Sequence, residues 1–396
     1  MRRTDIAIVG GGMAGSTAAA MLGRAGIDAI LVDPHDIYPA DFRVEKLDGS
    51  QVRLLQATGL ADALLPATTT SDDLWIVRHG LLVERRRNDQ YDAAYDTMVN
   101  TLRGAVTGSA TFVRGKAAGI APGRDRQRIA LADGTEIDAR LVVVANGLNA
   151  AMRRNLGMDR DVLSPCHSIS VGFDVRPRGR RAFDFGALTY YPERLAERIA
   201  YLTLFPIGTT TRANLFVYRD LRDPWLKQLR DRPLQTIAAA LPGLARFTGD
   251  FEVTGFVHIR PVDLYATTGY RQPGTVLVGD AFGTSCPAAG TGANKVFTDV
   301  ERLCNVYIPD WLAAPGMGAD KIADFYADDV KIACDAWSFE RARRVRSVAL
   351  ERGLPWRAYR GVRFVGQLGI GRLRGGRARP ATRTAGGERA TAGSGP

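Results

Sequence analysis

The sequence predicts an α/β fold in which a Rossmann-like domain is interrupted by an antiparallel-sheet domain and followed by a helical C-terminal segment. Three observations lead to this prediction. Residues 4–33 alternate strand, glycine turn, helix and strand; residues 164–260 carry several short strand patterns; and residues 298–346 carry helical patterns. Strands that alternate with helices favour a parallel sheet, whereas consecutive short strands favour antiparallel pairing.

The glycine turn lies between an apolar strand pattern over residues 4–9 and an alanine-rich helix that starts near residue 16. It matches the pattern G-x-G-x-x-G, which binds dinucleotides when it joins a strand to a helix. The first glycine permits the tight turn, the second lets a pyrophosphate approach the backbone, and the third lets the helix pack close to the strand. The turn residues that we expect to bind a nucleotide are Gly10, Gly12, Met13, Ala14 and Gly15.

An acid follows the second strand pattern, which covers residues 29–32. At this place Asp33 is expected to accept hydrogen bonds from ribose hydroxyls, and it favours NAD or FAD over a 2′-phosphorylated nucleotide. The free N–H groups at the helix N-terminus suit the phosphates. Arg43 and Arg53 follow closely and could reach flavin phosphates or a substrate carboxylate. The alternatives are a glycine turn in an ordinary α/β protein and, for the arginines, surface ion pairs.

The next elements extend both predicted domains. Residues 49–59 show an apolar side at helical spacing, residues 73–87 read as a hairpin around His79-Gly80, and residues 92–103 read as a helix. Strand patterns fill residues 110–145 and end in a fully apolar run. Such a run is typical of a central parallel strand, so the following Asn146 and Gly147 are expected at the cofactor crevice.

Residues 164–260 differ from the rest of the chain. Short strand patterns and one helix over residues 225–241 suggest a substrate domain inserted into the nucleotide-binding domain. A strand over residues 275–279 and helices over residues 298–306 and 321–346 follow. We expect the inserted strands at residues 168–175, 187–191, 199–206 and 212–218. We expect the nucleotide-binding domain at residues 1–70, 97–163 and 262–308, the substrate domain at 71–96 and 164–261, a helical segment at 309–365, and a disordered basic tail at 366–396.

Composition restricts the classes of partner. No apolar run approaches the ~18 residues that would cross a bilayer, and no room for a signal peptide precedes the first strand, so a cytoplasmic location is expected. The four cysteines lack C-x-x-C spacing, and we expect no metal site. The net charge is +11, with many arginines after residue 340. Because no nucleic-acid-binding motif occurs, we expect a solvated helix face or weak membrane association, and a monomer or homodimer.

A second glycine-rich motif covers residues 279–299. Asp280 directly follows a buried strand pattern and can accept from a ribityl hydroxyl, while Pro287 stiffens the loop that follows. The later glycines let backbone N–H groups face a ring system near a helix N-terminus, whose dipole stabilises negative charge. The residues of this motif that we expect to contact a cofactor are Asp280, Pro287, Gly290, Gly292, Ala293 and Asn294.

The two motifs together resemble those of the FAD-dependent monooxygenases of the para-hydroxybenzoate hydroxylase family, the class A flavoprotein aromatic hydroxylases. The resemblance covers roughly residues 4–345, and the family's middle motif falls on Asn146-Gly147 with Asn149 and Arg153. Three departures stand out. Asn146 replaces the usual Asp, no His follows the second motif's Asp280-Ala281, and Tyr95 and Asp96 occupy a helix that often carries an Arg.

The resemblance implies that FAD is the cofactor, that NADH or NADPH reduces it, and that O2 forms a flavin C4a-hydroperoxide. This species would hydroxylate or epoxidise an aromatic, phenolic or polyketide-like small molecule. A phenolic substrate would gain from a base. Tyr191, Tyr201 and His258 are the candidate catalytic residues, and Arg260 could hold an acidic substrate; each has a core or surface role as its alternative.

Other functions are also compatible with these motifs. The same scaffold supports an FAD-dependent oxidoreductase or dehydrogenase that inserts no oxygen. A flavin-dependent halogenase is disfavoured because no W-x-W-x-I-P segment occurs. The altered middle motif would also suit a flavin-binding scaffold without catalytic activity.

Overall fold

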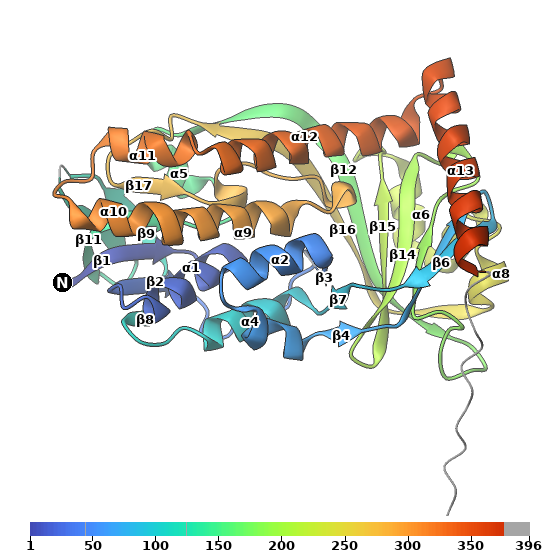
Figure 1. Ribbon diagram of the computed structural model, residues 1–396, viewed down its shortest axis with the longest axis horizontal. Coiled ribbons are helices and arrows are strands. Elements are labelled where there is room, and N and C mark those ends of the chain that lie inside the picture. Colours follow the sequence, from blue (N-terminus) through green and yellow to red (C-terminus); the bar gives the residue numbers. More distant parts are fainter. Residues whose placement is uncertain (44, 124, 376–396) are drawn as a thin grey trace, which may run out of the picture.

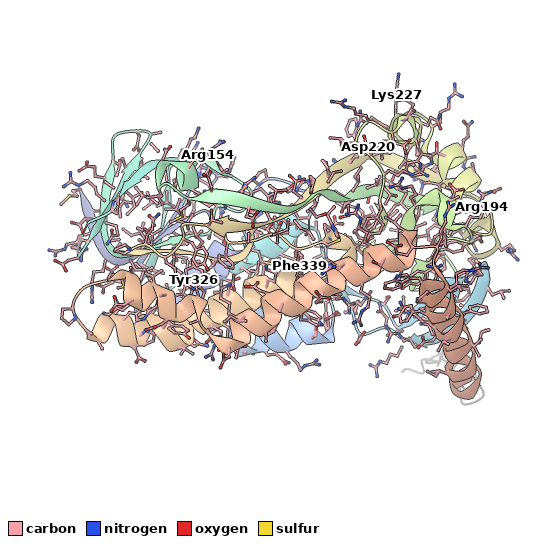
Figure 2. All side chains as sticks on the ribbon, turned by 90° about the horizontal axis from the view of Figure 1, so that it is seen from above. Arg154, Arg194, Asp220, Lys227, Tyr326 and Phe339 are labelled. Carbon is pink, nitrogen blue, oxygen red and sulfur yellow. The ribbon has the colours of Figure 1, made fainter. Side chains whose placement is uncertain are left out.

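The computed structural model describes residues 1–43, 45–123 and 125–375. Two seven-stranded sheets occupy the two halves of an elongated molecule, and the long helix α12 (Asp329–Leu350) runs from one half to the other (Figure 1). Seen from above, Tyr326 and Phe339 mark α11 and α12 along this length (Figure 2). The predicted combination of an α/β half, a second sheet and C-terminal helices is confirmed.

The first sheet has the strand order β8-β2-β1-β11-β10-β9, and β17 pairs with β11. Pairing is parallel from β8 to β11 and between β11 and β17, and antiparallel at β10 and β9. The strands are β1 (Arg2–Val9), β2 (Ala29–Asp33), β8 (Ala110–Arg114), β9 (Ala117–Ala121), β10 (Gln127–Leu131), β11 (Glu136–Val144) and β17 (Thr275–Leu277). The apolar end of β11 is fully buried, as its sequence predicts for a central parallel strand.

Helices cover the first sheet. α1 (Met13–Arg24) contacts α4 and α9, and α9 contacts α2 and α12. The helix α1 lies so close to β1 that a Cβ atom at Gly15 would stand 1.8 Å from the Gly10 carbonyl oxygen. The other helices of this half are α2 (Gly49–Ala57), α3 (Ala61–Leu64), α4 (Tyr95–Gly104), α5 (Ala151–Asn155), α9 (Gly292–Arg302), α10 (Ile308–Ala313) and α11 (Ala319–Tyr326).

The second sheet has the order β16-β12-β15-β14-β13-β5-β6, and only the β13–β5 pairing is parallel. Its strands are β5 (Asp73–Arg78), β6 (Leu81–Arg87), β12 (Asp159–Pro177), β13 (Ala187–Tyr190), β14 (Ile199–Ile207), β15 (Thr210–Val217) and β16 (Phe251–Thr268). The predicted hairpin is confirmed, with His79 and Gly80 both at positive φ as a two-residue turn requires. A small third sheet, β3-β7-β4, consists of β3 (Lys46–Leu47), β7 (Tyr91–Asp92) and β4 (Thr69–Thr70).

The two faces of the second sheet have different surroundings. Leu202 and Leu204 of β14 face a core that includes Leu226 and Ile237 from helices α6 (Pro224–Asp231) and α7 (Pro233–Ala240). A short helix, α8 (Ala245–Thr248), follows them. The alternate residues Tyr201 and Thr203 face a cavity on the opposite side. This alternation follows from the two-residue period of a strand.

Three predictions about helices need correction. The predicted helix 225–241 is two helices, because Pro233 has no N–H to donate and starts α7. The predicted helix 321–346 is also two, because Asp328 caps α12 through the Lys331 N–H. The predicted disordered tail is wrong for residues 366–375, which continue α13 (Leu354–Gly375). Residues 376–396 lie outside the described residues.

The helix α13 is held by packing that its composition did not reveal. Its Phe364 and Leu368 pack against a cluster of Leu74, Ile76 and Val83 from the hairpin. Among the described residues, no helix combines the length and apolar character needed to cross a membrane. The domain boundaries predicted from the sequence remain a prediction.

Candidate functional site

The carboxyl ends of the parallel strands in the first sheet meet at a cavity of about 130 Å³, here called the small cavity. This edge of a doubly wound sheet is where nucleotides bind. The predicted residues that line it are Gly10, Gly12, Met13, Ala14, Asp33, Arg43, Asn146, Gly147 and Asp280. Tyr38, Tyr95, Ala145, Val278 and Val296 complete the lining. The structure therefore brings the first, middle and last motifs to one place.

Asp33 is held in position at the end of β2. Its Oδ2 accepts a hydrogen bond from the Gly11 N–H at 2.7 Å, and its Oδ1 accepts from the His35 N–H at 3.0 Å. Arg103 on α4 lies 3.5 Å from Oδ1 and also donates to the Gly11 carbonyl oxygen. Sequence reasoning missed Arg103, because nothing local indicates that the end of α4 reaches the glycine turn.

Tyr95 and Arg43 form the outer side of the small cavity. The Met13 N–H, at the start of α1, donates to the Tyr95 hydroxyl oxygen at 3.2 Å. Arg43 lies over the Tyr95 ring, donates to Asp41 at 2.6 Å and stands 3.6 Å from Asp280. Burial raises the pKa of the Asp280 carboxyl, while the charge of Arg43 opposes this rise. Tyr95 thus lines the small cavity from the helix on which the resemblance leads us to expect an arginine.

The chemistry of this lining fits a flavin dinucleotide. Two carboxylates, Asp33 and Asp280, are available to hydroxyl groups, and the glycine turn exposes backbone N–H groups. Asn146 also leaves its side-chain oxygen buried without a hydrogen-bond partner. A buried acceptor of this kind is satisfied when a ligand donates to it. Ligand pockets usually enclose about 300–1,000 Å³, so the small cavity encloses one portion of a dinucleotide.

The second motif is rigidly connected to its neighbours. The Gly279 N–H donates to the buried Asp299 at 2.8 Å, and Asp299 pairs with Lys331 of α12 at 2.7 Å. Gln51 of α2 donates to the Gly290 carbonyl oxygen at 2.8 Å and to the Asn294 side chain at 2.9 Å. Asn294 therefore joins α9 to α2. The predicted residues Arg53, Pro287, Gly290, Gly292, Ala293 and Asn294 do not line the small cavity.

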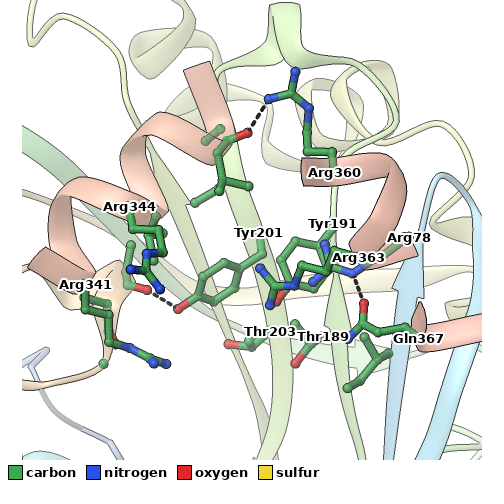
Figure 3. Close-up of a pocket in the computed structure, with 18 of the residues that line it drawn as sticks. Arg78, Thr189, Tyr191, Tyr201, Thr203, Arg341, Arg344, Arg360, Arg363 and Gln367 are labelled. Atoms are coloured by element: carbon green, nitrogen blue, oxygen red, sulfur yellow. Dashed lines mark hydrogen bonds between the residues drawn. The ribbon is translucent and has the colours of Figure 1, made fainter. Parts of the chain in front are cut away.

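A second cavity, of about 1530 Å³ and here called the large cavity, lies between the second sheet and helices α12 and α13 (Figure 3). Thr189, Tyr191, Tyr201 and Thr203 come from one face of the sheet. One side consists of the second-motif loop Ala288–Gly290. Side chains from the two helices cover it, among them Arg341, Arg344, Val345, Arg360 and Arg363. Arg53 and Gly290 of the predicted cofactor residues lie here.

The structure brings two of the three candidate catalytic residues together. The rings of Tyr191 and Tyr201 lie 5.7 Å apart in the large cavity. The Tyr201 hydroxyl donates to the Ala288 carbonyl oxygen at 2.7 Å, and burial raises its pKa well above the ordinary value. His258 is exposed, lies beside Phe42 and lines neither cavity. The structure does not bring His258 together with the two tyrosines, because β16 forms one edge of the sheet and is separated from β13 by other strands.

The structure also places the arginines that the sequence singles out. Arg260 forms an ion pair with Asp41, so its charge is already compensated. The arginines after residue 340, expected on a solvated face, are mostly exposed, and several of them also line the large cavity. Their spacing carried a signal, because Arg357, Arg360 and Arg363 recur every three residues and so follow one side of α13.

The fold and the small cavity define a flavin-dependent, two-sheet nucleotide-binding protein. A family described as "FAD binding domain" matches residues 3–308. The chain belongs to this family, the class A flavoprotein aromatic hydroxylases, and it is an FAD-dependent monooxygenase.

Individual relatives agree with this assignment. The chain is similar to the 3-demethoxyubiquinol 3-hydroxylase of Escherichia coli K12, at 27% identity over 340 residues, which is 77% of this chain and 80% of that protein. It is equally similar, at 27% over 327 residues, to the 3-amino-4-hydroxybenzoate 2-monooxygenase PtnB3 of Streptomyces platensis, covering 77% of this chain and 79% of that protein.

Solved structures show the same fold. The p-nitrophenol 4-monooxygenase PnpA from Pseudomonas putida DLL-E4 aligns with a TM-score of 0.75 at 16% identity, covering 94% of this chain and 97% of that one. The flavin-dependent brominase Bmp2 aligns with a TM-score of 0.67 at 15% identity, covering 95% and 90%. Because both a monooxygenase and a brominase share the fold, this likeness describes architecture alone.

Proposed function

We propose that the protein uses NADH or NADPH and O2 to hydroxylate or epoxidise an aromatic, phenolic or polyketide-like small molecule bound in the large cavity. The observation that carries this proposal is the position of the second-motif loop. Ala288 and Gly290 line the large cavity, while Asp280 of the same motif lines the small cavity. A substrate in the large cavity would therefore lie next to the cofactor loop. Relatives named as hydroxylases of aromatic compounds support the substrate class.

The residues of the small cavity would hold FAD. Asp33 and Asp280 would accept hydrogen bonds from hydroxyl groups, and the α1 N-terminus with Arg43 would face the phosphates. When bound and reduced, FAD supplies the activation of O2 that no side chain provides. The chain's own task is to position the substrate and exclude water around the reacting atoms.

The large cavity offers surfaces that suit an aromatic ring. Tyr191 and Tyr201 present their rings, and Thr189 and Thr203 present small polar groups beside them. Because the Tyr201 hydroxyl already donates to Ala288, its role is to shape the cavity next to the loop. Tyr191 remains the candidate partner of a phenolic hydroxyl. His258 has no part in this proposal.

The test is a visible absorption spectrum of the purified protein, followed by titration with NADH and NADPH in the presence and absence of O2. We expect oxidised-flavin bands near ~375 and ~450 nm that bleach with reductant and return in air. In the presence of substrate, reductant use should match the yield of oxygenated product. Turnover that does not need O2 would favour the dehydrogenase alternative. Bound flavin that neither nucleotide reduces would contradict NAD(P)H as the donor and would direct attention to Asn146.

A further inference from the structure

The helix α13 has an apolar face that none of the described residues covers. The helix lies toward one end of the elongated molecule beside β6 (Figure 1), and its Phe364 and Leu368 pack on the hairpin. On its other side Leu354, Val362 and Val365 are 77%, 74% and 66% exposed. An apolar patch that stays exposed on a folded protein commonly marks a surface that binds a partner or a membrane.

This apolar face is continuous along the helix. The residues that share it, at steps of three or four positions, are Leu354, Ala358, Val362, Val365 and Gly369. All of them are exposed. A helix that packs only on its own protein turns its apolar side inward and its charged side to water. Burial within this chain therefore does not account for the apolar residues on the outer side of α13.

Arginines border the apolar face. They occupy the opposite side of the helix, and Arg357 and Arg363, at the two ends of that run, reach the two borders of the face and are exposed. Residues 352–387 contain nine arginines and no acidic residue, and the whole chain carries a net charge of +11. An apolar helix face between basic borders is typical of a helix that lies in the plane of a membrane interface, because arginine side chains extend from there to the headgroups.

The charge distribution favours one occupant of this face. A second copy of the chain would bring the same arginines opposite each other, and residues 352–387 offer no carboxylate to pair with them. A nucleic acid would attract the arginines but would bind through its phosphates and leave the apolar residues in water. Anionic headgroups above acyl chains match both the arginines and the apolar face.

We propose that α13 binds the surface of an anionic phospholipid membrane, with Leu354, Val362 and Val365 inserted at the boundary between headgroups and acyl chains. The binding is peripheral, because a single helix face contacts the lipid. Arg360 and Gln367, on the opposite side of the same helix, line the large cavity, so the membrane would lie near that cavity. The proposal concerns a surface and is independent of the reaction proposed above.

The experiment measures how much of the full-length, flavin-loaded protein sediments with lipid vesicles. Vesicles of equimolar phosphatidylcholine and phosphatidylglycerol are compared with vesicles of phosphatidylcholine alone. We expect binding to the anionic vesicles to be about tenfold tighter or more, because each arginine near an anionic surface adds to the affinity. Added salt should weaken this binding, since ions screen the charge of the headgroups. Binding to neither kind of vesicle, or equal binding to both, would overturn the proposal.

Variants locate the binding surface. Val362→Gln combined with Val365→Gln keeps the charge of α13 and removes two apolar side chains from its outer face. We expect binding to the anionic vesicles to weaken about tenfold or more, because two buried apolar side chains are lost from the bound state. The melting temperature should stay unchanged, because both side chains are exposed in the free protein.

The matched control is Val330→Gln combined with Ile332→Gln, because both residues are 50% exposed on another helix, α12. This control should bind the anionic vesicles as tightly as the unmodified protein. Equal binding by the Val362 and Val365 double variant would contradict the role of the α13 face.

Sedimentation velocity without lipid tests the second copy as an occupant. A monomer that binds anionic vesicles supports the proposal. A dimer that the Val362 and Val365 double variant dissociates, together with no vesicle binding, would assign the face to a second copy and overturn the membrane site.

Discussion

The arginines near the two cavities differ in their partners. Beside the small cavity, Arg43 contacts Asp41 and Asp280, and Arg103 contacts Asp33. The buried Arg153 instead donates to the carbonyl oxygens of Gly147 and Ala281. In the large cavity Arg78 is 8% exposed, donates to the side-chain oxygen of Gln367 and lies over the Tyr191 ring, with no carboxylate in contact among the described residues. A paired cation fixes the geometry of its partner, whereas an unpaired one retains the capacity to bind an anion. The comparison thus distinguishes arginines whose ion pairs hold neighbouring residues in place from an arginine without an ion pair, which is available to bind an anion.

A buried histidine shows why arginine matters in this comparison. His167 on β12 is 2% exposed, and its Nε2 has no hydrogen-bond partner. Burial, together with the charge of Arg346, lowers the pKa of His167 to about 4. The His167 imidazole therefore avoids the cost of a buried charge, because it is neutral at neutral pH. Arg78 cannot do so and stays positively charged.

The largest effect should follow from filling the glycine turn of the small cavity. Any Cβ atom at Gly15 would meet the Gly10 carbonyl oxygen at 1.8 Å, so Gly15→Val must separate α1 from β1. We expect protein that purifies with little or no flavin and is destabilised by about 3 kcal/mol or more. Absorbance measures the flavin content, and urea denaturation measures the unfolding free energy.

The control is Gly119→Ala, where a Cβ atom meets nothing within 4 Å. Normal flavin content in the Gly15 variant would refute the predicted role of the turn.

Removing one member of a paired buried charge should have the next largest effect. Lys331 is 1% exposed and lies 2.7 Å from the buried carboxylate of Asp299. Lys331→Met would leave that carboxylate unpaired and cost about 3–5 kcal/mol of unfolding free energy, measured by urea denaturation. Adding Asp299→Asn should recover part of the loss, because it removes the buried carboxylate that has lost its cation. Asp335, the other partner of Lys331, keeps its ion pair with Lys295. A single variant as stable as the unmodified protein would show that this pair does not hold the second motif.

The buried imidazole predicts a pH dependence of stability. The pKa of His167 is about 4 in the folded state and about 6.5 when unfolded. Between these values the unfolded state binds more protons, so stability falls as pH decreases from about 6.5 to 4, by up to about 3 kcal/mol. We expect His167→Asn to flatten this part of the profile of unfolding free energy against pH. The exposed His258→Asn serves as control, and an unchanged slope in the His167 variant would contradict the prediction.

The smallest effect on stability should come from the unpaired arginine itself. Arg78→Met removes a buried charge whose loss leaves no carboxylate uncompensated, so we expect the unfolding free energy to stay within about 1 kcal/mol. The same assay on Lys331→Met provides the direct comparison between paired and unpaired cations. A loss of about 3 kcal/mol or more in the Arg78 variant would mean that Arg78 supports the fold, and the contrast between the two cavities would fail.

Much of the small cavity could be predicted from the sequence because its chemistry is encoded in consecutive residues. The glycine turn, Asp33 and Asp280 each directly follow a strand pattern, and the ends of parallel strands meet at one edge of a sheet. The chain order of strand, turn and helix was therefore enough to place them together. The hairpin around His79-Gly80 was likewise visible in local pattern.

Only the tertiary structure decided which distant side chains meet. Arg103 of α4 reaches Asp33 of β2, Gln51 of α2 reaches Asn294 of α9, and Arg363 of α13 lies beside Arg78 of β5. These contacts form because elements that are distant in the chain pack together, and no local pattern indicates such packing. The same holds for α13, where Phe364 and Leu368 pack on an apolar surface of the hairpin. Backbone motifs depend on neighbours in the chain, whereas the balance of charge in a cavity depends on every element that borders it.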